Sequence, residues 1–335
     1  MSVFEPYKIK NLEMRNRIVM APMCQYSAKD GIPSDWHTTH YLSRAHGGVG
    51  MIMVEMTNVE PRGRITDGCL GIWSDGHVPH YKRLVDAVHK TGAKIGIQIG
   101  HAGRKAEDDD EPVSSSAIAY SDKYKTPHEL TTEEAEEVIE NYRQGARRAV
   151  EAGFDTIEIH GAHGYLIHQF SAPRTNNRSD AFGQDLSLFG VKVILAMKKE
   201  MPEDMPLLMR MSSKEFADGG YDLDHSVYLA KQFKSAGVDM IHVSAGGEGK
   251  PSRERFPGAT PGYMLPYAKR IKEEVDIPVI AVGILDELKD AERAVSEAGA
   301  DLVALGRVLL RDPHWVLNND DSKQFVPEQY TRGYN

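Results

Sequence analysis

The sequence predicts a (β/α)8 barrel, a closed ring of eight parallel strands surrounded by helices. Eight short apolar runs recur along the 335 residues, and helical stretches separate them. Most of these runs are apolar almost throughout, which is typical of parallel strands buried on both faces. No Gly-x-Gly-x-x-Gly follows the first run, so the sequence disfavours the competing doubly wound dinucleotide-binding sheet.

The predicted strands follow one another at the spacing of strand–helix units. They cover residues 17–22, 49–56, 94–101, 156–162, 206–212, 239–246, 278–283 and 301–307. Between the third and fourth, Thr131-Thr132-Glu133-Glu134 forms a capping box, which predicts a helix that begins there and ends at Gly153. An Ala-Gly-x-Asp repeat at 152–155, 236–239 and 298–301 closes a helix and opens a strand each time.

We expect one domain over residues 1–335, with three additions to the barrel. An N-terminal segment should cap it, an extended loop at 105–131 should follow the third strand, and a C-terminal tail at 320–335 should reach a subunit interface. The acidic run at 107–111 should form a solvated part of that loop. Trp36, Trp73 and most of the 14 methionines are expected in the core.

Composition narrows the class of protein. Lys and Arg number 40 against 49 Asp and Glu, a net charge of −9, which disfavours nucleic acid and anionic membranes as partners. No apolar run approaches the roughly 20 residues that a membrane span needs, and the first residues lack a secretory pattern. Two cysteines cannot build a disulfide framework or a four-thiolate iron–sulfur site. We expect a cytoplasmic protein.

Polar and titratable side chains gather after the predicted strands, where barrel enzymes place their catalytic groups. They are Cys24 and Tyr26 after the first strand, Gln98 and Lys105 at the third, His160, His163 and Tyr165 at the fourth, Arg210 at the fifth and Arg307 at the eighth. Met23, Gly283 and Gly306 stand beside them at the ends of the first, seventh and eighth strands. The sequence therefore predicts an active site at this rim.

Two of these features leave alternatives open. Gly306 permits close backbone approach and Arg307 offers a forked cation, which suits a phosphate but equally suits a structural turn with a paired arginine. Cys24 is a nucleophile, a soft contact to a ligand, or a plain buried thiol, and the last is the commonest state of a free cysteine.

His160 and His163 have three interpretations: core histidines, metal ligands, or donors to a substrate oxygen. A metal would require a third ligand, usually a carboxylate, and the other strand ends supply none. Two neutral imidazoles can instead donate to one carbonyl oxygen and stabilise the negative charge that develops on it. A phenol such as Tyr165 stays protonated at neutral pH and can donate a proton.

Taken together, these motifs resemble the old yellow enzyme family of FMN-dependent ene-reductases, in its bacterial, thermophilic-like subgroup. The resemblance extends from about Phe4 to the C-terminus. It rests on the run from Asn16 to Tyr26, on Gln98 with His101-Ala-Gly-Arg-Lys105, on His160-x-x-His163-x-Tyr165, on Gly306-Arg307, and on the tail Tyr330-Thr-Arg332-Gly-Tyr334.

The resemblance implies a role for each site residue. FMN would lie across the barrel mouth, in contact with Met23, Cys24, Met56, Gln98, Arg210, Gly283, Gly306 and Arg307. NADPH or NADH would reduce it, and hydride would pass to the β-carbon of an enone. The enone would meet Tyr26, Lys105, His160, His163 and Arg332, and Tyr165 would protonate its α-carbon.

The resemblance also implies a homodimer, or a tetramer built from dimers, in which Arg332 enters the neighbouring subunit's site. Three positions depart from the family pattern. Met56 stands where Ala or Gly is usual, Ala21 stands where many relatives have Ser, and residues 184–187 differ from the usual Gly-Ser and Glu-Asn-Arg sequence.

Two other functions compete with ene reduction. One keeps the fold and the flavin but oxidises another substrate class, as a dehydrogenase or demethylase. The other is a metal-dependent barrel hydrolase that uses the two histidines. A non-enzymatic role is disfavoured because polar groups converge at one rim.

Overall fold

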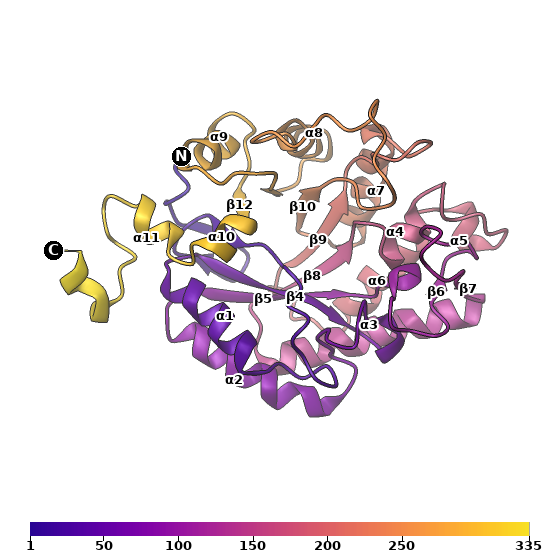
Figure 1. Ribbon diagram of the computed structural model, residues 1–335, viewed down its shortest axis with the longest axis horizontal. Helices are drawn as coiled ribbons and strands as arrows, with labels where there is room; N and C mark the ends of the chain where they lie inside the picture. The colour runs from indigo at the N-terminus through magenta and orange to yellow at the C-terminus, as the bar shows by residue number, and fades with distance from the viewer. Residues whose placement is uncertain (335) are drawn as a thin grey trace.

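Eight parallel strands close into the predicted barrel in the computed structural model, which describes residues 1–334 (Figure 1). They follow one another around the ring in chain order. The strands are β3 (Ile18–Met20), β4 (Met51–Asn58), β5 (Lys94–Gly100), β8 (Thr156–Gly161), β9 (Leu207–Ser212), β10 (Met240–Ser244), β11 (Val279–Ala281) and β12 (Leu302–Leu305). Every predicted strand is confirmed, with ends that differ by a few residues: most strands are shorter than predicted, and β4 extends two residues beyond its predicted end.

Helices surround the barrel and connect its strands (Figure 1). They are α1 (Asp35–His46), α2 (Val78–His89), α3 (Thr132–Ala152), α4 (Leu166–Ser171), α5 (Ala181–Gln184), α6 (Leu188–Lys198), α7 (Leu223–Ala236), α8 (Leu265–Val275), α9 (Leu288–Ser296), α10 (Arg307–Arg311) and α11 (Trp315–Asn319). The predicted capping box starts α3: Glu134 N donates to Thr131 Oγ1 at 3.1 Å, and Thr131 N donates to Glu134 Oε2 at 2.8 Å. Gly153 ends α3 at a left-handed φ of +88°, as predicted.

The predicted N-terminal cap is an antiparallel hairpin of β1 (Tyr7–Ile9) and β2 (Leu12–Met14). Leu12 and Met14 are buried against inward side chains near the starts of the strands. Those side chains are Val19, Met51, Met53, Leu208, Met240 and Leu302. The hairpin therefore closes one end of the barrel, and the opposite end remains for ligands.

The extended loop after β5 carries some structure of its own. A 3-10 turn, η3 (Gly103–Lys105), precedes it, and its strands β6 (Val113–Ser114) and β7 (His128–Glu129) pair in parallel. The acidic run at 107–111 is exposed apart from half-buried Asp109, as predicted. The C-terminal tail ends in the 3-10 helix η4 (Glu328–Gly333), which extends away from the barrel (Figure 1). Asn335, the last residue of the predicted tail, lies outside the described residues.

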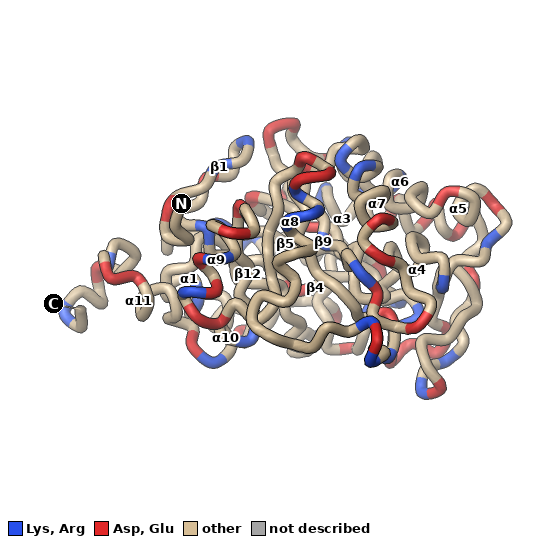
Figure 2. The backbone as a smooth tube through the Cα atoms, turned by 90° about the horizontal axis from the view of Figure 1, so that it is seen from above, with Lys and Arg blue, Asp and Glu red and all other residues tan. Residues whose placement is uncertain are grey.

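One core prediction is wrong. Trp36 is 57 % exposed, because it lies in the first turn of α1 on a face that this chain leaves uncovered, stacked on His40 at 6.5 Å between ring centroids. Trp73 is half-buried and most methionines are buried. Basic and acidic residues are interspersed over the outer helices and loops (Figure 2). Among residues 1–334, no helix combines the length and apolar character that crossing a bilayer requires.

Candidate active site

Strand register brings the predicted site residues together at the open end of the barrel. His160 on β8 pairs with Arg210 on β9, and Arg210 pairs with His242 on β10. Gln98 on β5 pairs with Glu158, two residues before His160 on β8. Because side chains on a strand alternate between its faces, Glu158 and His160 both point into the barrel.

The two histidines and Tyr165 form one cluster. The rings of His160 and His163 lie 5.2 Å apart between centroids, and those of His160 and Tyr165 lie 4.7 Å apart, both edge-on. His160 Nδ1 accepts from Ala162 N at 3.3 Å, so Nε2 carries the proton and is the donor of that ring. His163 Nε2 lies 2.7 Å from Ser244 Oγ.

The ionisation states in this cluster suit hydrogen-bond donation. Burial lowers the pKa of His160 and His163 well below the usual value, and the charge of Arg210 lowers both further. Both imidazoles are therefore neutral near pH 7, which leaves each ring with one N–H. Burial raises the pKa of Tyr165 well above its usual value, so its phenol keeps its proton.

Lys105 lies against the turn that carries His163. Its Nζ donates to His163 O at 3.0 Å and to Gly247 O at 3.1 Å. The ammonium also lies 4.8 Å from the Tyr165 ring centroid and 4.6 Å from that of Tyr120. Burial and neighbouring Arg104 lower the pKa of Lys105 to about 8, so the cation supports His163 and Tyr165 at neutral pH.

The turn after β3 is held by a residue that the sequence did not single out. Glu55 on β4 accepts from Gln25 N at 2.7 Å and from the Tyr41 hydroxyl at 3.0 Å. Gln25 lies between Cys24 and Tyr26, so Glu55 fixes the backbone that positions both. Burial, followed by the charge of Glu55, raises the pKa of the Cys24 thiol, which argues against Cys24 as a nucleophile at neutral pH.

Glu55 gives a prediction for stability. Burial raises its pKa from 4.5 to about 7. Between these values the folded chain binds more protons at this site than the unfolded chain, so stability decreases as pH rises through the window, by about 3 kcal/mol at most. In Glu55→Gln this decrease should be smaller than in wild type. Thermal unfolding from pH 4 to 8, with the exposed Glu13→Gln as control, measures the difference, and parallel profiles for Glu55→Gln and wild type would contradict it.

Four of the eight residues predicted to hold the cofactor line one cavity of about 130 Å3 at the barrel mouth, whereas Met23, Cys24, Met56 and Gln98 are not among its lining residues. Arg210, Ser244, Gly283, Gly306 and Arg307 all border it. A Cβ built on Gly306 would stand 3.6 Å from Met23 Sδ, which places Met23 beside this cavity. Gly283 has φ +126°, a conformation that favours glycine.

Arg210 supplies the observation that this cavity suits an acceptor group of FMN. Its Nε is buried and has no hydrogen-bond partner among residues 1–334. Nε of Arg17 and of Arg104 also lacks a partner within the described chain, but Arg210 is the arginine of these three that borders the cavity, where a ligand would supply the acceptor. The pyrimidine edge and the phosphate of FMN would offer acceptors to Arg210 and Arg307.

Met56 is accommodated by Gly100 across the β4–β5 pair. A Cβ on Gly100 would stand 2.8 Å from Met56 Cγ and Sδ, so the missing side chain provides the space for the larger residue. Met56 is buried in a cluster with Ile65, Cys69, Ala102 and Ala106. The altered loop at 184–187 is also locally satisfied, because Ser187 donates to Asp185 Oδ1 from both N and Oγ.

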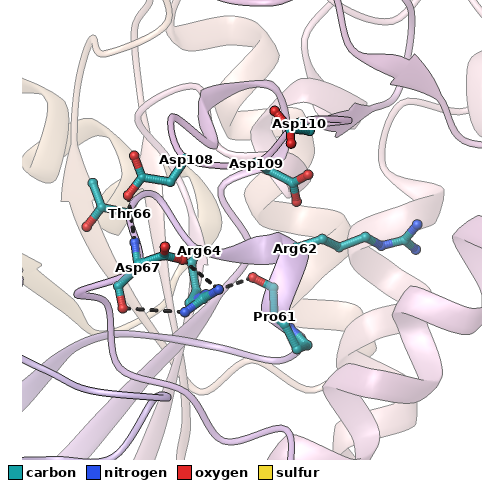
Figure 3. Close-up of a pocket in the computed structure, with 8 residues that line it drawn as sticks. All are labelled: Pro61, Arg62, Arg64, Thr66, Asp67, Asp108, Asp109 and Asp110. Carbon is teal, nitrogen blue, oxygen red and sulfur yellow. Dashed lines mark hydrogen bonds and ion pairs between the residues drawn. The ribbon is translucent and has the colours of Figure 1, made fainter.

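A larger pocket of about 370 Å3 lies away from these residues (Figure 3). Pro61, Arg62, Arg64, Thr66, Asp67, Asp108, Asp109 and Asp110 line it. Its charges are partly matched internally: Arg64 pairs with Asp67 at 2.7 Å, and Asp67 N donates to Asp108 Oδ2 at 2.8 Å. This pocket holds none of the predicted site residues.

Comparison with known proteins decides the family. The sequence profile of the NADH:flavin oxidoreductase / NADH oxidase family matches residues 2–322. The chain belongs to this family. An NADPH dehydrogenase of Listeria monocytogenes is 43% identical over 341 residues, which cover 99% of each chain.

Two solved structures share the fold. Morphinone reductase has a TM-score of 0.82 at 26% identity and is matched over 96% of this chain and 92% of its own. The old yellow enzyme from Trypanosoma cruzi has a TM-score of 0.79 at 25% identity, over 94% and 90%. The resemblance to the old yellow enzymes is confirmed, and the protein is an FMN-dependent oxidoreductase that uses a nicotinamide reductant.

The metal-hydrolase alternative lacks a ligand set in the described part of the chain. Residues 1–334 contain no group of three or more His, Cys, Asp or Glu side chains arranged to hold a metal ion. Arg332, in contrast with the other predicted site residues, is not brought to the rim. It is exposed on η4, in the tail that extends from the barrel.

Proposed function

We propose that this protein is an NAD(P)H-dependent ene-reductase that acts on α,β-unsaturated carbonyl compounds. The observation that supports this function is the pair of neutral imidazoles beside a half-buried, protonated phenol at the barrel mouth, next to a cavity bordered by Arg210 and Arg307. Two neutral donors polarise a carbonyl oxygen, and the phenol provides the proton that completes reduction of the double bond.

We propose that the cofactor is held by Gln98 and Arg210 at its pyrimidine edge and by Gly283, Gly306 and Arg307 at its phosphate. Met23, Cys24 and Met56 would contact its ring system. When bound, FMN accepts hydride from NADPH or NADH and supplies it to the substrate. Arg210 would stabilise negative charge on the pyrimidine edge, because a buried cation interacts strongly with a nearby anion.

His160 and His163 would each donate an N–H to the carbonyl oxygen of the enone and hold its β-carbon toward the cofactor. Tyr165 would deliver its proton to the α-carbon. Tyr26 and Lys105 would border the substrate, with Lys105 also steadying His163 through its carbonyl. The free cysteines and the nicotinamide requirement suit a cytoplasmic location.

The direct test is NADPH-dependent loss of cyclohexenone by purified, FMN-loaded protein. We expect cyclohexanone as product, with one NADPH consumed for each enone reduced. Consumption of NADPH that is unaffected by a range of enones would refute ene reduction and leave only the oxidoreductase assignment.

We further propose that the active unit is a homodimer, or a tetramer of dimers, in which Arg332 enters the site of the partner subunit. All six residues of η4 retain solvent exposure, and the tail extends away from its own barrel (Figure 1). A segment with so little support from its own chain is ordered most readily by a second subunit.

Mixed dimers test this arrangement. We expect Arg332→Ala to raise KM for the enone, because it removes a cation from the substrate pocket. Consider a dimer of one Tyr165→Phe subunit and one Arg332→Ala subunit. If each site takes Arg332 from its partner, the site of the Tyr165→Phe subunit carries both defects. The site of the other subunit is then intact. At an enone concentration well below the wild-type KM, the mixed dimer should therefore recover half the rate of the wild-type dimer. Mixed dimers no more active than the two parent variants would show that Arg332 acts within its own subunit.

A further inference from the structure

A buried polar network centred on Glu158, two residues before His160 on β8, lies inside the barrel mouth. Gln98 Nε2 donates to Glu158 Oε1 at 2.7 Å, and His242 Nδ1 donates to Glu158 Oε2 at 2.8 Å. Gln98 is 2 % exposed, and Glu158 and His242 are fully buried. The three side chains come from β5, β8 and β10, and Arg210 lies between the latter two on β9.

The donors fix the charge state of this network. Burial raises the pKa of Glu158, but His242, Arg210 and the Gln98 hydrogen bond outweigh burial and the net pKa is lowered. Burial lowers the pKa of His242, so a neutral imidazole donates its Nδ1–H. Glu158 is therefore a buried carboxylate with a donor on each oxygen, and such an anion needs a positive counterpart nearby.

The same hydrogen bond fixes the orientation of the Gln98 amide. Because Nε2 donates to Glu158, Oε1 faces the other way and is an acceptor. The pyrimidine edge of FMN carries an N–H donor between two carbonyl oxygens, so an amide with its oxygen outward matches the donor. A reversed amide would present a donor to that N–H and lose the bond.

Arg210 connects this network to the cofactor cavity. It borders the cavity, its Nε has no partner among residues 1–334, and Glu158 is the leading source of negative charge acting on its pKa. Without Glu158, the full charge of Arg210 would face the flavin. The negative charge of Glu158, deeper in the barrel, cancels part of the field that Arg210 exerts on the flavin.

We propose that Glu158 is a positioning residue with two effects on the flavin: it sets the direction of the Gln98 amide, and it moderates the field of Arg210. The reduced flavin carries negative charge, so moderating this field lowers the reduction potential. The inference rests on the FMN placement proposed above and is independent of the substrate.

Three variants separate the two effects. Glu158→Gln removes the charge and half of the acceptor capacity. Glu158→Asp keeps the charge but, being one methylene shorter, cannot reach both donors. Glu60→Gln is the matched control, because Glu60 is also a buried carboxylate bonded to a histidine, His101, at 2.7 Å. For each variant we would measure the FMN midpoint potential and the dissociation constant of FMN from the apoprotein.

Glu158→Gln should raise the midpoint potential and weaken FMN binding by about tenfold, the loss expected for one buried hydrogen bond. Glu158→Asp should weaken FMN binding similarly but keep a midpoint close to wild type, and Glu60→Gln should change neither. A wild-type midpoint in Glu158→Gln would overturn the inference. If that variant does not retain FMN, Glu158→Asp decides: a wild-type midpoint supports the role of the charge, and a raised midpoint overturns it.

These results are distinguishable from a failure of the proposed function. A protein that reduces no enone can still show the shift in potential. A protein that binds FMN and reduces enones normally, with no shift in Glu158→Gln, would refute this inference alone.

Discussion

Replacing Tyr165 by Phe should reduce turnover of weakly activated enones by about 10²- to 10⁴-fold, the range that a positioned proton donor contributes. The phenol of Tyr165 is half-buried and its pKa is raised, so it keeps its proton and lies beside the ring of His160. Reduction of the flavin by NADPH needs no proton from this residue and should persist. Stopped-flow measurement of the two half-reactions separates these effects.

The matched control for this variant is Tyr120→Phe. Tyr120 also lies against the ammonium of Lys105, at 4.6 Å from its ring centroid, but it has no contact with His160 among those described. It should show near-wild-type rates in both half-reactions. Equal turnover of Tyr165→Phe and wild type with all weakly activated enones would refute the proton-donor role.

Replacing His160 by Ala should lower the rate at which cyclohexenone reoxidises the reduced enzyme by about 10²- to 10³-fold, the usual cost of one lost donor to a developing oxyanion. The structure singles out His160 because Ala162 N occupies its Nδ1 and leaves the Nε2 proton for the substrate. Reoxidation by molecular oxygen needs no carbonyl donor, so its rate serves as the internal control. A parallel loss in both reactions would indicate a disturbed flavin site and contradict the assignment.

Local sequence signals predicted the barrel well. The apolar runs form strands because a parallel strand in a barrel is buried on both faces, and all eight residues of Met51–Asn58 are buried. Thr131 and Gly153 delimited α3 because capping chemistry is local. The rim residues His160 and Arg210 followed from their place at the strand ends, since parallel strands all end on the same side.

The missed residues depend on contacts between distant parts of the chain. Glu55 and Glu158 stand within apolar runs, and their partners Tyr41 and His242 come from other elements. Glu158 and His160 are two residues apart on one strand, so their side chains share a face. This spacing could have predicted that Glu158 lies inside the barrel near the site. Trp36 was misassigned because composition shows that a tryptophan prefers burial but does not show which helix faces the chain itself leaves uncovered.

The central claim is that FMN lies over the barrel mouth with a carbonyl oxygen held between the two histidines. A crystal structure of the FMN-loaded enzyme with bound cyclohexanone, the saturated product, tests it directly. We expect the flavin's pyrimidine edge beside Arg210 and its phosphate beside Gly306, where both residues border one cavity, and the ketone oxygen within hydrogen-bond distance of His160 and His163. A ketone bound elsewhere, or a flavin outside this cavity, would contradict the account.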